Sequence, residues 1–161
     1  MQINDIFDLS QYDEAYKFVS ENKGTTIEDL GGGKYKIVEL PKPSLDELKL
    51  AKRAEINRAR DAAEQGGFEY LGKTFDSDQI SAQRISMAAQ AMALAPEGTT
   101  ITWTCQDNTT IDLTAQELVG LVVALAEWSN TCHQKATALK AQIDAAKTAE
   151  ELEKITWSDK D

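Results

Sequence analysis

The longest uninterrupted helical pattern in this chain covers residues 114–146, and it constrains the fold more than any other feature. Thr114 and Glu117 stand at the spacing of a capping box, in which each side chain binds the other residue's backbone amide at a helix start. The apolar side chains that follow recur every three or four residues, as on one face of a helix. These are Leu118, Leu121, Leu125, Trp128, Cys132, Ala136, Leu139, Ile143 and Ala146.

The length of this predicted helix limits how the chain can pack. About 32 helical residues extend roughly 48 Å, whereas a compact protein of this size has a diameter near ~40 Å. Either the helix breaks near Ser129 and Asn130, or the molecule is elongated and the second half packs on something else. The first half also carries Val119, Val122 and Val123, so it is predicted to be deeply buried, whereas the second half has a single apolar stripe.

Three pairs of short β patterns predict three hairpins. In the clearest pair, Ile101, Trp103 and Cys105 alternate with threonines and form one apolar face, so Trp103 is predicted to be core. Asn108 can take the left-handed conformation in the turn before residues 110–113. The other hairpins are predicted at residues 25–30 with 34–40, around three glycines, and at residues 68–70 with 74–75. Short hairpins packed on long helices define an α+β fold.

The segment Pro41-Lys42-Pro43 predicts a boundary between two domains. Residues 1–43 are predicted to form an N-terminal head and a proline linker. The head is a helix from about Gln11 to Asn22, capped by Ser10, followed by the first hairpin.

Residues 44–161 are predicted to form a helix-hairpin-helix-hairpin-long-helix domain. Its first helix opens at a capping box of Ser44 and Glu47 and ends at two glycines, residues 66 and 67. A second helix covers residues 79–94, with Asp78 as its N-cap. Its buried stripe is predicted to be Ile80, Ile85, Ala88 and Met92.

Charge and composition disfavour several classes of partner. The chain carries 27 acidic and 17 basic side chains, a net charge of −10. Because nucleic acids and anionic membranes are bound mainly through Lys and Arg, neither is expected as a partner. No segment has the ~20 apolar residues that a membrane-spanning helix needs. The N-terminus lacks the features of a signal peptide, so the expected location is cytoplasmic.

No residue pattern predicts an active site, a cofactor or a metal. His133 is the sole histidine, and its neighbour Cys132 points about 100° away from it on a helix, so the two cannot form a nucleophile pair. Cys105 and Cys132 are read as small buried hydrophobes. The acidic segment Asp76-Ser77-Asp78 could bind a hard cation, but a helix cap is the preferred interpretation. The expected protein is therefore not an enzyme.

Two thin apolar stripes predict association with another chain. The helix after Ser44 offers Leu48 and Ile56, and the end of the long helix offers Leu139 and Ile143. Such faces are too apolar for a fully solvated helix and too narrow for a deep core. Their heptad-like spacing suits a coiled seam, so these four are the candidate partner-binding residues. The expected assembly is a homo-oligomer, with a trimer favoured, or a complex with a fibre protein.

The stretch from about Leu48 to Trp157 resembles a domain family of uncharacterised function from phages and prophages, the DUF4376 type. The motif at residues 66–78, Gly-Gly-Phe-Glu-Tyr-Leu-Gly-Lys-Thr-Phe-Asp-Ser-Asp, carries most of the resemblance. Further matching segments are Ala54-Glu55-Ile56-Asn57 with Arg60-Asp61, Ser81-Ala82-Gln83-Arg84-Ile85, Trp103 with Asp107-Asn108, Cys132-His133 before Leu139-Lys140-Ala141, and Glu151-Leu152-Glu153-Lys154-Ile155-Thr156-Trp157.

The resemblance implies a tail or tail-fibre gene product with no enzyme activity and no functional residues to carry over. The expected function is a structural or tail-fibre assembly protein, a chaperone or connector, of a bacteriophage tail. Its expected location is the host cytoplasm during assembly, with the virion tail as a further destination. Two alternatives stay open: a small prophage-encoded adaptor or regulator, and a glycan-acting enzyme with two carboxylates.

Overall fold

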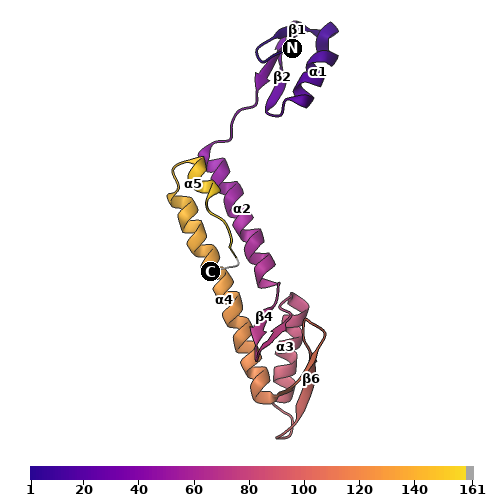
Figure 1. The fold of residues 1–161 in the computed structure, drawn as a ribbon, viewed down its shortest axis with the longest axis vertical. Helices are drawn as coiled ribbons and strands as arrows, with labels where there is room; N and C mark the ends of the chain where they lie inside the picture. Colours follow the sequence, from indigo (N-terminus) through magenta and orange to yellow (C-terminus); the bar gives the residue numbers. More distant parts are fainter. Residues whose placement is uncertain (159–161) are drawn as a thin grey trace. The chain divides into compact units, whose positions relative to one another are not determined.

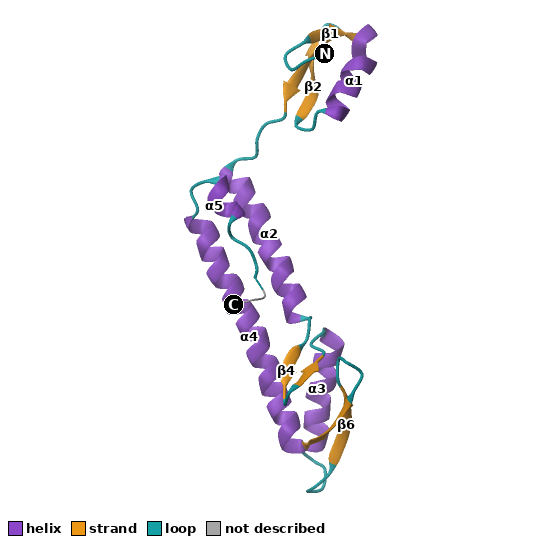
Figure 2. Ribbon diagram, in the orientation of Figure 1, coloured by secondary structure: helices purple, strands orange, loops and turns teal. Residues whose placement is uncertain are grey.

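The computed structural model describes residues 1–158 and consists of two compact units, Met1–Ser44 and a second that begins at Leu45. Both units combine helices with short antiparallel sheets (Figures 1 and 2), which confirms the predicted α+β class. None of the helices formed by the described residues is long and apolar enough to cross a bilayer.

The first unit is a three-stranded antiparallel sheet with one helix. The predicted hairpin is confirmed, and the sheet order is β1-β3-β2, because an unpredicted strand joins the free edge of the second hairpin strand. The core holds Phe7, Ala15 and Ile37, which are almost fully buried. The elements are β1 (Ile6–Asp8), the 3-10 turn η1 (Leu9–Gln11), α1 (Tyr12–Glu21), β2 (Thr25–Gly31) and β3 (Lys34–Glu39).

The predicted cap of α1 is wrong. Ser10 lies inside η1, and its amide and hydroxyl both donate to the carboxylate of Asp8, so Asp8 caps the turn instead. The residue before α1, Gln11, makes no side-chain capping bond. Because the chain winds through η1 before the helix, Tyr16 is turned outward and is 65% exposed.

The second unit contains two hairpins and four helices. Each predicted helix and hairpin is present, and the long helix runs unbroken for 31 residues, through Ser129 and Asn130. The elements are α2 (Leu45–Glu64), β4 (Phe68–Tyr70), β5 (Lys73–Phe75), α3 (Gln79–Met92), β6 (Thr100–Thr104), β7 (Thr110–Thr114), α4 (Ala115–Ala145) and α5 (Ala149–Glu153).

Local sequence signals place these boundaries. The predicted capping box at the start of α4 is confirmed, with the Thr114 hydroxyl accepting from the Glu117 amide and the Glu117 carboxylate accepting from the Thr114 amide. Asp78 caps α3 as predicted, accepting the amides of Ile80 and Ser81 at 2.9 and 3.2 Å. Asn108 takes the left-handed conformation, φ 62°, in the β6–β7 turn. Short-range hydrogen bonding therefore fixes where α3 and α4 begin, and a left-handed residue fixes the β6–β7 turn.

The first core of the second unit lies where α3, the first half of α4 and the two hairpins meet. Phe75, Ile85, Leu113, Leu118 and Leu121 are fully buried there. Trp103 packs against this core but is only half-buried. On α4, Gly120 leaves room for the Tyr70 ring, because a Cβ at this glycine would stand 2.1 Å from the Tyr70 hydroxyl.

The second core of the second unit lies between α2, the end of α4, and α5 (Figure 1). The long helix does not project into solvent alone, because α2 lies beside its second half. Ile155 is buried in this core and Trp157 packs against it, so the segment after α5 returns along the helices.

Two predicted buried faces are wrong. Val119 and Val123 are 53% and 50% exposed, because only the Leu118–Leu121 side of α4 faces the first core. On α3, Ile80 is 59% exposed, whereas Ile85 and Met92 are buried as predicted. Both helices therefore leave large apolar side chains on the surface.

Candidate interaction surfaces

The four candidate partner-binding residues lie together inside the second unit. Ile56 and Ile143 are fully buried in its second core, and Leu48 and Leu139 pack against them. The two thin stripes thus cover each other along the α2–α4 pair. Polar contacts close the same seam, since Arg53 forms an ion pair with the Asp144 carboxylate. Their role in binding a partner stays a prediction, and it would require α2 and α4 to separate.

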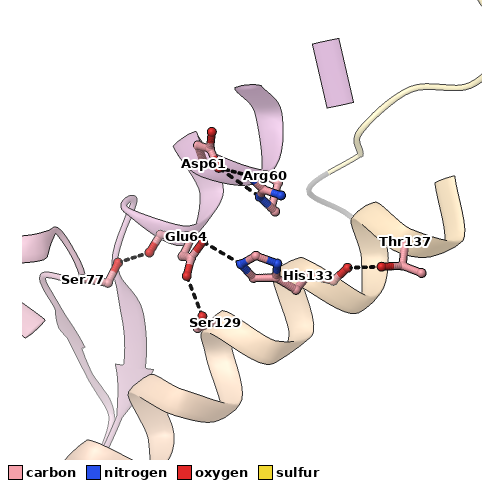
Figure 3. A network of polar contacts seen from close by, with 7 residues as sticks. All are labelled: Arg60, Asp61, Glu64, Ser77, Ser129, His133 and Thr137. Atoms are coloured by element: carbon pink, nitrogen blue, oxygen red, sulfur yellow. Dashed lines mark hydrogen bonds and ion pairs between the residues drawn. The ribbon is translucent and has the colours of Figure 1, made fainter. Parts of the chain in front are cut away.

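A polar network joins the C-terminal end of α2 to α4 and to the loop before α3 (Figure 3). The Glu64 carboxylate accepts a 2.5 Å hydrogen bond from the Ser129 hydroxyl and lies 3.3 Å from His133 Nε2. The Ser77 hydroxyl donates to the Glu64 carbonyl at 2.5 Å. The same Ser77 hydroxyl oxygen accepts from the Gly67 amide at 2.9 Å. The network therefore fixes the α2 terminus against its neighbours.

The order of groups in this network does not match a nucleophile–base–acid triad. A triad places histidine between the hydroxyl and the acid, so that the imidazole accepts the hydroxyl proton. Here Glu64 stands between Ser129 and His133, and the serine proton points at the carboxylate. The arrangement can hold two helices in register, and it does not activate the serine by this route.

The acidic segment before α3 acts as a cap. The Asp78 carboxylate accepts from the Ser81 hydroxyl at 2.6 Å, and the bonds from Ser81 lower the pKa of Asp78. Ser77 is buried in the network around Glu64. Within residues 1–158, no three His, Cys, Asp or Glu side chains come together in a group that could hold a metal ion.

Both cysteines are free and buried, as predicted. Burial, together with the nearby Glu64 carboxylate, raises the pKa of the Cys132 thiol. Because the thiolate is the reactive form, we expect iodoacetamide to modify the folded protein at least about tenfold more slowly than the urea-unfolded chain at pH 8. Mass spectrometry over time measures the modification, and rapid labelling of native Cys132 would contradict its placement.

The raised pKa of Cys132 also predicts a pH dependence of stability. As the pH rises past 9.0, the ordinary pKa of a cysteine thiol, the unfolded chain loses the Cys132 proton before the folded protein does, so we expect the free energy of unfolding to fall.

An uncharged surface, here called the α3–α4 surface, follows the outer side of α3 onto the start of α4. Met87 is 68% exposed and Val119 is 53% exposed, although the chain carries net charge −10. Two shallow depressions that share Ser86 run along this surface. Its residues are Gln79, Ala82, Gln83, Ser86, Met87, Ala89, Gln90, Ala93, Val119 and Val122.

A groove of about 510 Å³, here called the β6 groove, separates α3 from strand β6. Met87, Ala88 and Ala91 line one wall, and residues 101–104 line the other. Asp76 and Arg84 also line it and carry opposite charges. Sequence reasoning placed Trp103 in the core and did not predict this groove. The signals that could have drawn attention to it are the charge-free strand Thr-Ile-Thr-Trp-Thr and the charge-free residues 85–96.

The fold and its surfaces define a helical-hairpin α+β domain without an assembled catalytic cluster among the groups just described. The chain belongs to the family Domain of unknown function (DUF4376), whose model matches residues 47–156. The match covers most of the second unit, including both walls of the β6 groove. No curated protein and no solved structure matches this sequence significantly.

Proposed function

We propose that this protein is a structural or tail-fibre assembly component of a bacteriophage tail, acting as a chaperone or connector through protein–protein contacts. The α3–α4 surface is the observation that carries the proposal. Large exposed apolar side chains such as Met87 and Val119, on a surface whose lining residues are all uncharged, suit the centre of a protein interface. The sequence resemblance to phage and prophage domains supports the choice of a tail protein.

The acidic charge supports a protein partner over a polyanion. With a net charge of −10, the chain would repel nucleic acid and anionic lipid at most approaches. The residues of the α3–α4 surface carry no charge, so this repulsion is weakest there. An apolar patch on a fibre or other tail protein can therefore bind at this surface. Assembly in the host cytoplasm, with a later place in the virion tail, belongs to the same proposal.

A homo-oligomer is also part of the proposal. The trimer expected from fibre symmetry rested on a seam through Leu139 and Ile143, whose apolar groups meet those of α2 within the chain. We therefore carry the homo-oligomer forward without that seam, and a solution mass decides between the trimer favoured by the sequence and another stoichiometry.

Co-expression with the product of a neighbouring fibre gene tests the partner. We expect a stable complex, seen as one peak of higher mass by size-exclusion chromatography with light scattering. Val119→Glu with Gln90→Glu should weaken the complex at least about tenfold, because two carboxylates enter an uncharged contact. Ala141→Glu with Ala145→Glu, on exposed positions of α4 outside the α3–α4 surface, is the matched control and should bind normally. Absence of any complex with the fibre product would refute the proposed function.

A further inference from the structure

Strand β6 presents a free backbone edge to the β6 groove. It pairs with β7 in a sheet of two strands, and within residues 1–158 no strand occupies its other side along Thr100–Thr104. A two-stranded sheet is marginally stable alone. Edge strands are usually protected by charged side chains, proline or bulges. Residues 100–104 contain no charge and no proline, so this edge lacks those protections.

The hydrogen-bond pattern shows which backbone groups point into the groove. Cys105 N donates to Thr109 O at 2.8 Å, so this pair is hydrogen-bonded to β7. Bonded and non-bonded pairs alternate in an antiparallel ladder. The amides and carbonyls of Thr100, Thr102 and Thr104 therefore point away from β7. The next outward residue agrees, since the amide of Gln106 donates to Thr74 O at 3.0 Å.

The edge is complementary to itself. Antiparallel pairing of two copies around Thr102 sets Thr102 opposite Thr102, Thr100 opposite Thr104, and Ile101 opposite Trp103. All three threonine pairs would then exchange backbone bonds, roughly six in total. Ile101 opposite Trp103 is a favourable β-branched–aromatic pair. Pairing would stop at Gln106, where Thr74 already accepts the outward amide.

The low local charge of the edge is compatible with a second copy as the occupant. Two chains that each carry −10 repel one another, so a contact between copies must fall where carboxylates are few. The β6 strand is uncharged, and the groove's Asp76 and Arg84 cancel each other. The α3 wall of the groove beside this strand consists of the small side chains Ala88 and Ala91 and the exposed Met87.

We propose that two copies of this chain associate through their β6 edges, forming a continuous four-stranded sheet in the order β7-β6-β6-β7 about a two-fold axis at Thr102. The proposal deepens the homo-oligomer of the proposed function and rests on it. A two-fold junction closes at two chains, so the expected species is a dimer.

Two paired variants test the junction. Thr102→Pro removes the central amide donor without removing a bond to β7, because that amide points outward, a position where proline is tolerated in edge strands. Thr102→Val loses the same hydroxyl contact with Asp112 but keeps the amide, so it is the matched control. Sedimentation equilibrium should give a dimer for the wild type and for Thr102→Val. Thr102→Pro should weaken association at least about tenfold while keeping the wild-type circular dichroism.

A charge pair tests the register itself and does not depend on proline. Thr100→Lys with Thr104→Lys sets like charges opposite each other across the junction, although it lowers the net negative charge. Thr100→Lys with Thr104→Glu sets opposite charges there instead. Cross-strand charge pairs favour the second variant, so we expect its dimer to be at least about fivefold tighter.

The proposal is overturned if the wild type is monomeric at high concentration, if it is a trimer, or if the two charge variants dimerise equally. If the wild type is a monomer that binds the fibre product, and Thr102→Pro abolishes that binding, the β6 edge binds a partner protein and not a second copy. Val119→Glu with Gln90→Glu should abolish fibre binding and leave the dimer intact, because neither residue lines the β6 groove. The two proposals therefore fail in different measurements.

Discussion

Replacing Ile143 by aspartate is expected to disrupt the α2–α4 pair. Ile143 is 0% exposed in the second core, beside the equally buried Ile56 and among apolar side chains. A buried unpaired charge costs more than about 4 kcal/mol, against a total stability of typically ~5–15 kcal/mol. Because α2 and α4 contain 20 and 31 residues, far-ultraviolet circular dichroism should lose much of its helical signal, and the urea midpoint should fall.

The matched control is Ala141→Asp, two residues earlier on the exposed side of the same helix. It adds the same charge to the same helix and should change the stability by no more than about 0.5 kcal/mol. The predicted seam with another chain makes the opposite forecast for Ile143→Asp. A variant with the wild-type helical signal and midpoint that lost only its oligomeric state would favour that seam.

Much of the local structure was predictable because short-range chemistry determines it. The capping box of Thr114 and Glu117, the Asp78 cap and the Asn108 turn each depend on residues within a few positions of one another. The third strand of the first unit was missed because Ile6–Asp8 is only three residues long and pairs across more than twenty positions. The Ser10 cap failed for a local reason, since Asp8 is the stronger acceptor two residues earlier.

The arrangement of faces was less predictable. Periodicity identified the stripes on α2 and α4, but it could not show that they cover each other, because that depends on the hairpin between them folding the chain back. The same limit explains Val119 and Val123, which continue an apolar run yet stay about half exposed, because only the Leu118–Leu121 side of α4 faces the first core. The β6 groove depends on how α3 and β6 lie beside each other, a tertiary arrangement that a side-chain pattern does not contain.

Replacing Phe75 by alanine is expected to destabilise the second unit by ~3–5 kcal/mol, the usual cost of deleting a buried phenyl ring. Phe75 is 0% exposed, and its ring centroid lies 6.0 Å from that of Phe68 and 6.2 Å from that of Tyr70. Both ring contacts lie within the β4–β5 hairpin, and Phe75 joins that hairpin to the first core, which also contains Leu118 and Leu121 of α4. Trp103→Ala should cost less, because Trp103 is only half-buried at the rim of the same core. Equilibrium urea unfolding followed by circular dichroism measures the three proteins.

The control for Phe75→Ala is Val123→Ala, which removes an apolar side chain from α4 at a site that is 50% exposed. A change within about 1 kcal/mol of the wild type is expected, since little burial is lost and alanine favours the helix. A large loss of stability in Val123→Ala would instead indicate that Val123 is buried in the core, as the sequence pattern alone had predicted. A small loss at Phe75 would instead mean that the first core can close over the missing ring, and that the β4–β5 hairpin contributes little to holding α3 and α4 in place.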